Sequence, residues 1–274
     1  MQLAFEGGQI ALHYRENSSP SLKSDRSVVT RADQEVSALA HGIFKDFLKR
    51  PDHILIDEED EKRLQYLNED SLQKFPYIFA IDPVDGTRGY ANRMPHFGIS
   101  IGLLKCLKPW LGVVYFPVLK EIFYCDGERS YFVQNAFQKD EVKAVISPID
   151  QEINKQAIFL LPDSYFNRFE WDFENCHIMI PACAAVDLCW PAVGRGCGSL
   201  IKSYLWDFAG SWPIVQSAGL DFRHWRTGKV LDNLTMESLD QDKTPWKLKE
   251  YYIVSSERNF PILQRKITPK KKPA

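Results

Sequence analysis

Several features of specialised protein classes are missing from this sequence. No apolar run approaches the roughly 20 residues that a membrane-spanning helix needs, so we expect no membrane association. The 34 Lys and Arg residues nearly balance the 36 Asp and Glu residues, and this balance offers no basic surface for nucleic acid. The N-terminal segment MQLAFEGGQIALHYRE lacks the basic start and the small-residue cleavage site of a secretion signal, so we expect a cytoplasmic protein.

Closely spaced cysteines are missing as well. The six cysteines are scattered along the chain, and none forms a C-x-x-C pair. Buried, reduced thiols are therefore a better interpretation than disulfides or a zinc site.

The first half of the chain combines two helical patterns with a series of short apolar runs. A helix is predicted over residues 1–17. A second, amphipathic helix has apolar residues on one face from Val36 to Leu48 and ends at Arg50-Pro51. The runs that follow are short and close together, as in an antiparallel sheet, and lie at 53–57, 77–82, 97–105, 111–117, 121–126 and near 130.

The charged segment 138–155 is a candidate hinge, and it divides the chain into an N-terminal half (1–140) and a C-terminal half (141–274). The second half contains apolar runs, an apolar helix near 183–194, a helix from Trp206 to Gly219 and a late strand at 250–256. Helices and strands mix in both halves, which indicates a layered α/β or α+β protein.

The most informative stretch is Asp82-Pro83-Val84-Asp85-Gly86-Thr87, which directly follows an apolar strand. Pro83 stiffens the turn, so that two carboxylates at a strand end can converge on one point and hold a hard cation such as Mg²⁺. Gly86 permits a close approach of the backbone, and a helix beginning near Thr87 would offer free N–H groups to a phosphate. The plain alternative is an Asx-type turn that closes the strand.

Three other acidic groups lie at comparable positions in the chain. The run Asp57–Glu61 follows the apolar segment HILI, Asp207 opens a helix, and Asp33 follows Thr30 before the amphipathic helix. Each has an ordinary explanation by itself: a solvated charge run, a helix N-cap and a capping box, respectively.

Together, the four pieces resemble the inositol monophosphatase superfamily. Its pattern is T-x-x-D, then G-E-E, then D-P-I/L-D-G-T, then W-D-x-A-A/G-G. The corresponding residues of this chain have the same order and similar spacing, and they are Thr30–Asp33, Asp57–Glu59, Asp82–Thr87 and Trp206–Gly210. The segments 94–104 and 182–196 also look like parts of the family.

The resemblance implies an α+β fold, a layered αβαβα sandwich, and a magnesium-dependent phosphomonoesterase that acts on a small phosphorylated metabolite. It implies that two or three Mg²⁺ ions are held by the side chains of Glu58, Asp82, Asp85 and Asp207 and by the carbonyl of Val84. It also implies lithium inhibition and a possible homodimer.

The resemblance further assigns catalytic and binding roles. Water would be activated beside Glu58 and Thr87, with Asp33 behind Thr87. The N–H groups of Gly86 and Thr87 would bind the phosphate, and Arg88 and Asp207 would contact the substrate.

Five places in the chain depart from the family pattern, and one of them is Arg88-Gly89-Tyr90, which stands where the family has Asn-Phe. Asp57 replaces the glycine of G-E-E, where an extra carboxylate beside a metal would alter its occupancy, and Ser217 replaces the glutamate of an E-A-G-G string. The residues from Leu200 to Lys202 stand where inositol monophosphatases have a ring-contacting glutamate. Pro213 removes a backbone hydrogen bond and is predicted to kink its helix.

The substrate therefore stays open among three kinds of phosphate ester. Inositol 1-phosphate comes first as the commonest assignment in the family, and a 3′(2′),5′-bisphosphate nucleotide and histidinol phosphate are the alternatives. Arg88 either binds a second anionic group or is an ordinary surface residue. A different hypothesis, a non-catalytic regulatory or binding protein, is motivated by Asp57 and Ser217, whereas the intact metal-ligand positions argue against it.

Overall fold

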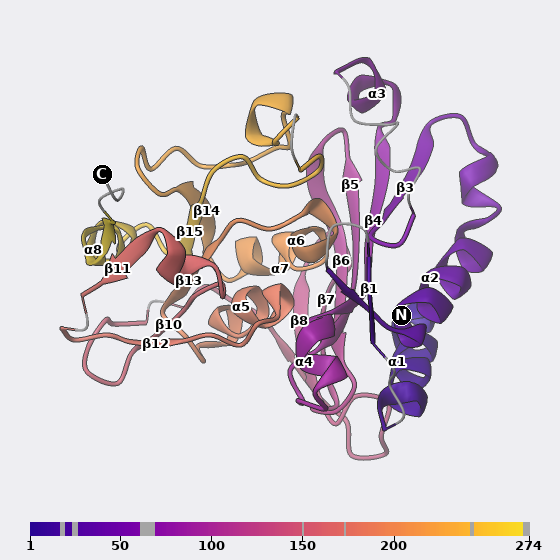
Figure 1. Ribbon diagram of the computed structural model, residues 1–274, viewed down its shortest axis with the longest axis horizontal. Helices are drawn as coiled ribbons and strands as arrows, with labels where there is room; N and C mark the ends of the chain where they lie inside the picture. Colours follow the sequence, from indigo (N-terminus) through magenta and orange to yellow (C-terminus); the bar gives the residue numbers. More distant parts are fainter. Residues whose placement is uncertain are drawn as a thin grey trace.

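The computed structural model describes residues 1–16, 20–23, 27–60, 69–149, 151–172, 174–241 and 244–270. Glu61, at the end of the acidic run, and the lysine-rich tail from residue 271 lie outside these ranges. Helices and sheets alternate in five layers from one side of the molecule to the other (Figure 1). The predicted αβαβα sandwich of the α+β class is thus confirmed.

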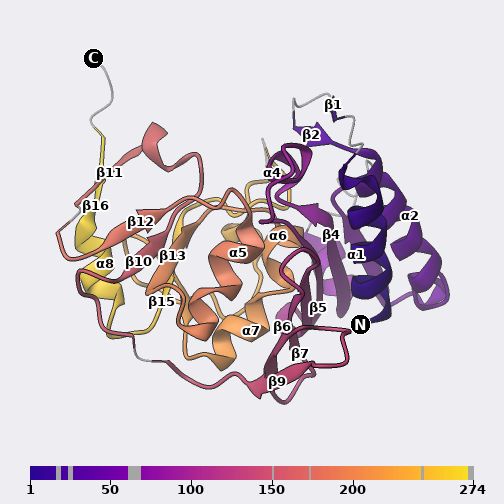
Figure 2. The same cartoon turned by 90° about the horizontal axis from the view of Figure 1, so that it is seen from below.

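The first two layers are a pair of helices and a seven-stranded sheet. Helices α1 (Gln2–Arg15) and α2 (Arg31–Phe44) lie side by side on the outer face of the sheet (Figure 2). A Cβ atom added at Gly8 would clash with the ring of Tyr115, so this glycine permits the close approach of α1 to the sheet. The strands, in spatial order, are β3 (His53–Asp57), β4 (Tyr77–Asp85), β5 (Gly98–Lys105), β6 (Lys108–Phe116), β7 (Glu121–Cys125), β8 (Ser130–Gln134) and β9 (Val142–Val145).

The direction of β3 differs from the sequence-based expectation. The pairs from β4 to β8 are antiparallel as predicted, but β3 pairs with β4 in parallel, with Asp57 opposite Ile81. Strand β9, which was not predicted, pairs antiparallel with β8. The connection over residues 58–76, which includes α3 (Glu69–Lys74), is long enough for the crossover that a parallel pair requires. This direction places the ends of β3 and β4 at the same edge of the sheet.

The middle layer consists of three short helices, α5 (Ala184–Cys189), α6 (Leu205–Ala209) and α7 (Trp212–Ser217). The predicted helix from Trp206 to Gly219 is two helices, because the chain breaks at Gly210 and Pro213 stands in the first turn of α7, where no backbone N–H is needed. Pro213 therefore begins a helix and does not kink one. The large core between the two sheets includes Phe208, Trp212 and Phe222, whose ring centroids lie 5.5 to 5.8 Å apart.

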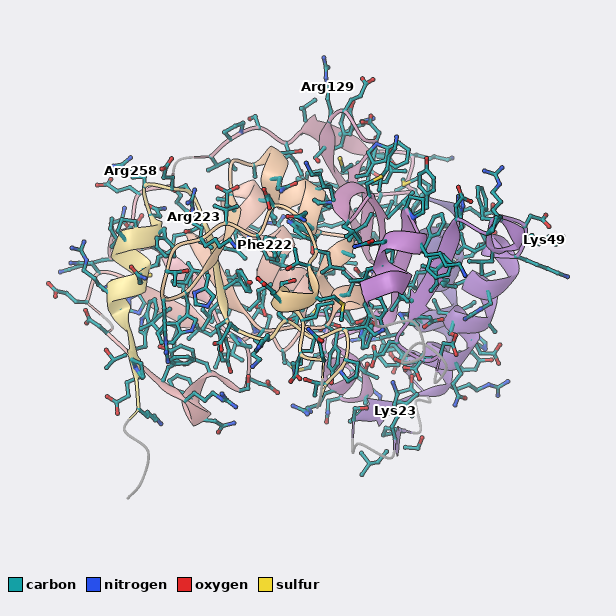
Figure 3. The ribbon with its side chains drawn as sticks, turned by 90° about the horizontal axis from the view of Figure 1, so that it is seen from above. Lys23, Lys49, Arg129, Phe222, Arg223 and Arg258 are labelled. Carbon is teal, nitrogen blue, oxygen red and sulfur yellow. The ribbon has the colours of Figure 1, made fainter. Side chains whose placement is uncertain are left out.

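The fourth layer is a five-stranded sheet with the order β12 (His177–Met179), β10 (Ile158–Leu160), β13 (Gly198–Ile201), β15 (Tyr252–Ser255) and β14 (Asp221–His224). Helix α8 (Phe260–Lys266) packs on its outer face. Two small antiparallel pairs complete the fold, namely β1 (Ser21–Leu22) with β2 (Val28–Val29) and β11 (Phe169–Trp171) with β16 (Ile267–Pro269). In the side-chain view, Phe222 lies inside the molecule, whereas Lys49 and Arg129 point outward (Figure 3).

The first sheet extends beyond residue 140, because β9 lies within the segment that was considered a hinge. Five of the six cysteines are buried, and Cys106 is exposed. No helix within the described ranges is both long enough and apolar enough to cross a bilayer.

Candidate active site

The acidic groups meet at the edge of the first sheet where β3 and β4 end. Because the two strands are parallel, Glu58 follows β3 beside the end of β4, and its N–H donates to the carbonyl of Ile81 at 3.2 Å. The pairing of β4 with β5 shifts register between Asp82 and Asp85, and Pro83, which has no N–H to donate, lies in this bulge. The bulge brings both aspartates to the same edge.

Gly86 makes the turn that follows. It has a φ of 85°, which glycine adopts without strain, and a Cβ at this position would lie 2.9 Å from the carbonyl oxygen of His96. Helix α4 (Thr87–Ala91) begins immediately after it, as predicted for this stretch. Gly86 and Thr87 consequently line the same pocket as Asp85.

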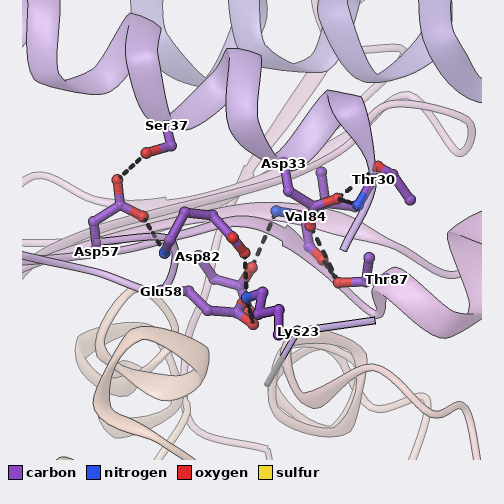
Figure 4. Close-up of polar contacts among 10 residues, drawn as sticks. Lys23, Thr30, Asp33, Ser37, Asp57, Glu58, Asp82, Val84 and Thr87 are labelled. Atoms are coloured by element: carbon purple, nitrogen blue, oxygen red, sulfur yellow. Dashed lines mark hydrogen bonds and ion pairs between the residues drawn. The ribbon is translucent and has the colours of Figure 1, made fainter. Parts of the chain in front are cut away.

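Asp33 connects helix α2 to this turn. One carboxylate oxygen accepts hydrogen bonds from the N–H and the hydroxyl of Thr30, at 2.8 and 2.6 Å, which is the capping box expected from the sequence. The other oxygen lies 3.2 Å from Oγ1 of Thr87, and that hydroxyl also lies 2.9 Å from the carbonyl oxygen of Val84 (Figure 4). Burial raises the pKa of Asp33 to about 6. Asp33 thus has two roles: one carboxylate oxygen caps helix α2, and the other contacts Thr87 of the predicted site.

Lys23 is a member of this site that was not among the predicted site residues. Its ammonium group lies 3.1 Å from Oε1 of Glu58 and 2.5 Å from Oε1 of Glu59 (Figure 4). Burial lowers the pKa of Lys23, but the two carboxylates outweigh this effect and the net shift is upward. Burial and the charge of Glu58 raise the pKa of Glu59 to about 7. No local sequence signal links Lys23 to residues so far along the chain.

The three remaining aspartates accept hydrogen bonds from backbone amides. Asp82 accepts from Val84 at 3.0 Å, and Asp207 accepts from Tyr204 at 2.9 Å. Asp85 accepts from the first residues of α5, Ala184 at 3.1 Å and Ala185. These amides orient the carboxylates without neutralising their charge.

The carboxylates also repel one another. Burial, followed by the charges of Glu58, Asp85 and Asp207, raises the pKa of Asp82 well above its usual range. Burial and the charge of Asp85 do the same for the pKa of Asp207, and burial raises the pKa of Asp85 to about 6. The site therefore carries more negative charge than its surroundings compensate.

A divalent cation fits this charge and this set of oxygen donors. In the described part of the chain, however, no three His, Cys, Asp or Glu side chains converge closely enough to hold an ion without moving. The carboxylates face amides and Lys23, so side-chain rotations would have to bring the predicted ligands together.

A cavity of about 310 Å³ lies over the acidic edge, a size that suits a small metabolite. Arg88, at its rim, forms an ion pair with Asp163 at 2.6 Å, and both side chains are more than half exposed. The lining also includes charged residues of both signs, namely Glu58, Asp85, Asp163, Asp187, Asp207, Arg88, Lys202 and Lys247.

Asp57 points away from the cavity, which corrects the expectation of an extra carboxylate beside a metal. Its buried carboxylate accepts hydrogen bonds from the hydroxyl of Ser37 at 2.6 Å and from the N–H of Glu59 at 2.9 Å (Figure 4). It also lies 3.3 Å from Nε2 of His41. Successive residues of an extended chain face opposite sides, so Asp57 faces helix α2 while Glu58 lines the cavity.

The other departures also have simple structural explanations. The Ser217 hydroxyl lies 2.8 Å from that of Ser130 on β8, among residues that do not line the cavity. Leu200 is fully buried in the core beside the second sheet, so it does not replace a substrate-contacting side chain.

Comparison with known proteins agrees with this layered fold, which is the fold of solved structures described as inositol monophosphatases. The family model described as "Inositol monophosphatase family" matches residues 1–259. The chain therefore belongs to the inositol monophosphatase family.

Three curated relatives illustrate its breadth. The 3′(2′),5′-bisphosphate nucleotidase CysQ of Salmonella typhimurium is 26% identical over 86% of this chain and 93% of its own length. The Nus factor SuhB of Pasteurella multocida is 29% identical over 78% of each chain. Inositol monophosphatase 1 of Solanum lycopersicum is 29% identical over 72% of each chain.

Solved structures share the fold. A staphylococcal IMPase complexed with products has a TM-score of 0.73 at 16% identity, covering 98% of this chain and 95% of the other. An IMPase/NADP phosphatase complexed with Mg²⁺ and phosphate has a TM-score of 0.70 at 15% identity, covering 95% and 90%.

Proposed function

We propose that this chain is a divalent-metal-dependent phosphomonoesterase that hydrolyses a small phosphorylated metabolite. The observation that carries the proposal is the cavity lined by Glu58 after β3, Asp85 of β4 and Asp207 of α6, beside the Gly86–Thr87 turn. Their mutual repulsion supports a role as cation ligands, since buried carboxylates without compensating charge are unfavourable.

The donor set supports Mg²⁺, held by Glu58, Asp82, Asp85, Asp207 and the carbonyl of Val84. When bound, two or three such ions supply charge neutralisation of the phosphate, a lowered pKa of water and stabilisation of the leaving oxygen. The structural neighbour that was solved in complex with Mg²⁺ and phosphate favours this cofactor.

The protein's own groups have distinct tasks in the proposed reaction. The N–H groups of Gly86 and Thr87 donate hydrogen bonds to phosphate oxygens. Glu58 and the Thr87 hydroxyl accept hydrogen bonds from the attacking water and orient it, and the carboxylate of Glu58 takes up its proton. Asp33 holds the Thr87 hydroxyl through the 3.2 Å contact and so determines which way its lone pairs face.

Two substrate classes lead. Inositol 1-phosphate is the first, by family resemblance and by the tomato relative. A 3′(2′),5′-bisphosphate nucleotide is the second, and two observations favour it. The residues from Leu200 to Lys202, which stand where inositol monophosphatases have the ring-contacting glutamate, include no carboxylate, and the CysQ relative aligns over 86% of the chain. Histidinol phosphate is a third class to be included in any test.

Phosphate release with and without Mg²⁺ tests the proposal directly. The panel consists of inositol 1-phosphate, adenosine 3′,5′-bisphosphate, histidinol phosphate and fructose 1,6-bisphosphate, and lithium is added as an inhibitor of any activity found. Metal-dependent turnover of one ester is the expected result. A folded, metal-binding protein that releases phosphate from none of them would contradict the proposal and favour a regulatory or binding protein.

A further inference from the structure

We propose that a second cavity, between strands β14 and β15 and the segment 229–238, binds a small zwitterionic metabolite, an amino acid with free ammonium and carboxylate groups. The cavity has a volume of about 150 Å³, about half that of the cavity over the acidic edge, and the two cavities share no lining residue. A ligand here would thus bind independently of the phosphate ester that we propose for the acidic edge.

The segment 229–238 is anchored at the end of the first sheet that is remote from the acidic turn. Strand β5 begins at Gly98, opposite Asp85, and ends at Lys105, where the turn to β6 follows. The N–H of Leu234, within the lining segment, donates to the carbonyl of Leu107 in this turn at 2.8 Å. The second cavity is thus a separate feature of the fold and not an extension of the acidic one.

Hydrogen bonds hold the walls of this cavity in place. Strands β14 and β15 lie side by side in the second sheet (Figure 1), and in the hairpin after β14 the N–H of His224 donates to the carbonyl of Lys229 at 2.9 Å. A capping box formed by Thr235 and Ser238 closes the 3₁₀ turn η5 (Met236–Ser238), with the hydroxyl of Ser238 3.1 Å from the backbone nitrogen of Thr235. Walls that are fixed before a ligand arrives lose little conformational entropy on binding.

Two polar side chains of the lining offer hydrogen-bond donors. Nδ1 of His224 accepts from the N–H groups of Arg226 and Thr227 at 3.3 and 3.2 Å, so the proton of the neutral ring is on Nε2. Burial lowers the pKa of His224 and so keeps the ring neutral. Tyr252, which is 7% exposed, packs edge-on against this ring. Within the described residues, neither Nε2 of His224 nor the Tyr252 hydroxyl has a hydrogen-bond partner, so both are available to a ligand.

Charged side chains of both signs line the cavity without pairing with one another. In the described part of the chain, Lys229 is not within ion-pair distance of Asp232 or Glu237. Just outside the lining, Arg226 and Glu250 add one charge of each sign. Because positive and negative charge nearly balance, a ligand with a single charge would meet repulsion as well as attraction, whereas a zwitterion is complementary to both signs.

The size and the lining of the cavity together define the class of ligand. The volume is below the roughly 300 to 1,000 Å³ of pockets for drug-sized ligands, which favours a molecule of amino-acid size over a nucleotide or a peptide. Lys229, His224 and Tyr252 are donors for a carboxylate, whereas Asp232 and Glu237 are acceptors for an ammonium group. An α-amino acid carries both groups on one carbon atom, so a single small molecule can contact both sets.

The test is a binding measurement on the full chain, and it needs no turnover of a phosphate ester. Each proteinogenic amino acid is screened singly by saturation-transfer NMR, and calorimetric titration gives Kd for those that bind. The α-amide of a ligand lacks the carboxylate and its N-acetyl derivative lacks the ammonium group, so the two are matched probes, and ribose is a neutral comparison. The variants are Lys229→Gln and the combination of Asp232→Asn with Glu237→Gln. Lys155→Gln is the control, since Lys155 is exposed and lines neither cavity.

We expect at least one amino acid to bind, and removal of either charged group to weaken its affinity about tenfold or more. Lys229→Gln should weaken binding of the amino acid but not of its amide, and the double carboxylate variant should weaken binding of the amino acid but not of its N-acetyl derivative. The control should bind as wild type does, and thermal unfolding checks that each variant is folded. Binding of no amino acid, equal wild-type affinity for the derivatives, unchanged affinity in both variants, or tighter binding of ribose than of every amino acid would overturn the proposal.

Discussion

The hydroxyl of Thr87 lies 3.2 Å from a carboxylate oxygen of Asp33, which joins the first turn of helix α2 to the turn after β4. Asp33→Asn keeps an acceptor for Thr30 but removes the charge that orients Thr87. We expect kcat to fall about 100-fold or more, as for loss of a group that assists proton transfer, with little change in Tm. Thr87→Ser, which keeps the hydroxyl, serves as the control. A large loss of Tm with unchanged kcat would make Asp33 a capping residue alone.

Asp85→Asn and Asp207→Asn should abolish most activity and weaken Mg²⁺ binding. Because these carboxylates are buried and mutually repulsive, neither variant should be less stable than wild type in EDTA. Thermal unfolding with and without Mg²⁺ provides the measurement, since the rise in Tm caused by Mg²⁺ should be lost. Unfolded variants beside a stable metal-free wild type would show that the aspartates are structural.

The stability of the metal-free protein should fall as pH rises from about 4 to about 7. Burial raises the pKa of Asp33 and Asp85 to about 6, and that of Glu59 to about 7. The folded state therefore holds protons that the unfolded chain releases near pH 4, and this contribution is lost as pH passes through the folded pKa values.

Urea unfolding in EDTA at pH 5 and 7.5 measures this slope, and Mg²⁺ should reduce it by compensating the carboxylates. Asp126→Asn is an informative comparison. Hydrogen bonds from the N–H groups of Arg129 and Glu128 lower the pKa of Asp126, so its contribution has the opposite sign. Stability in EDTA that increases with pH would contradict the prediction.

Asp57→Gly restores the family's usual residue but should destabilise this chain. It removes the 2.6 Å hydrogen bond from Ser37 and leaves His41 without its carboxylate. We expect a loss of about 1 to 3 kcal/mol in the free energy of unfolding, measured in urea, with Mg²⁺ affinity nearly unchanged. Ser37→Ala is the matched control, with a smaller loss. A marked change in Mg²⁺ affinity would place Asp57 in the metal site after all.

Arg88→Ala should reduce the turnover of a bisphosphate more than that of inositol 1-phosphate. The guanidinium lies at the rim of the cavity, 2.6 Å from Asp163, where it can exchange this exposed partner for a substrate anion. Values of kcat/KM for the two substrates decide the matter, with Asp163→Asn expected to act in the opposite direction. Equal losses for both substrates would remove any selectivity role from Arg88.

Local sequence was sufficient wherever neighbouring residues carry the signal. The spacing of apolar residues along one face predicts helix α2. The apolar strand that runs into Asp82-Pro83-Val84-Asp85-Gly86-Thr87 predicts the acidic turn, and Pro83 and Gly86 are the residues that shape its backbone. The order of four such motifs was enough to predict the family and the layered fold, since each motif is contiguous in the chain.

Tertiary structure decided what depends on contacts between distant segments. Strand β3 pairs in parallel with β4, and this direction brings Glu58 to the end of β4 and directs Asp57 to helix α2. Lys23 contacts Glu58, and Lys247 lines the cavity, only because segments remote in the sequence pack together there. Hydrophobic periodicity predicts which face of a helix or strand is buried, but not which distant element packs against that face. For that reason, only the folded chain shows which charged side chains lie around this cavity.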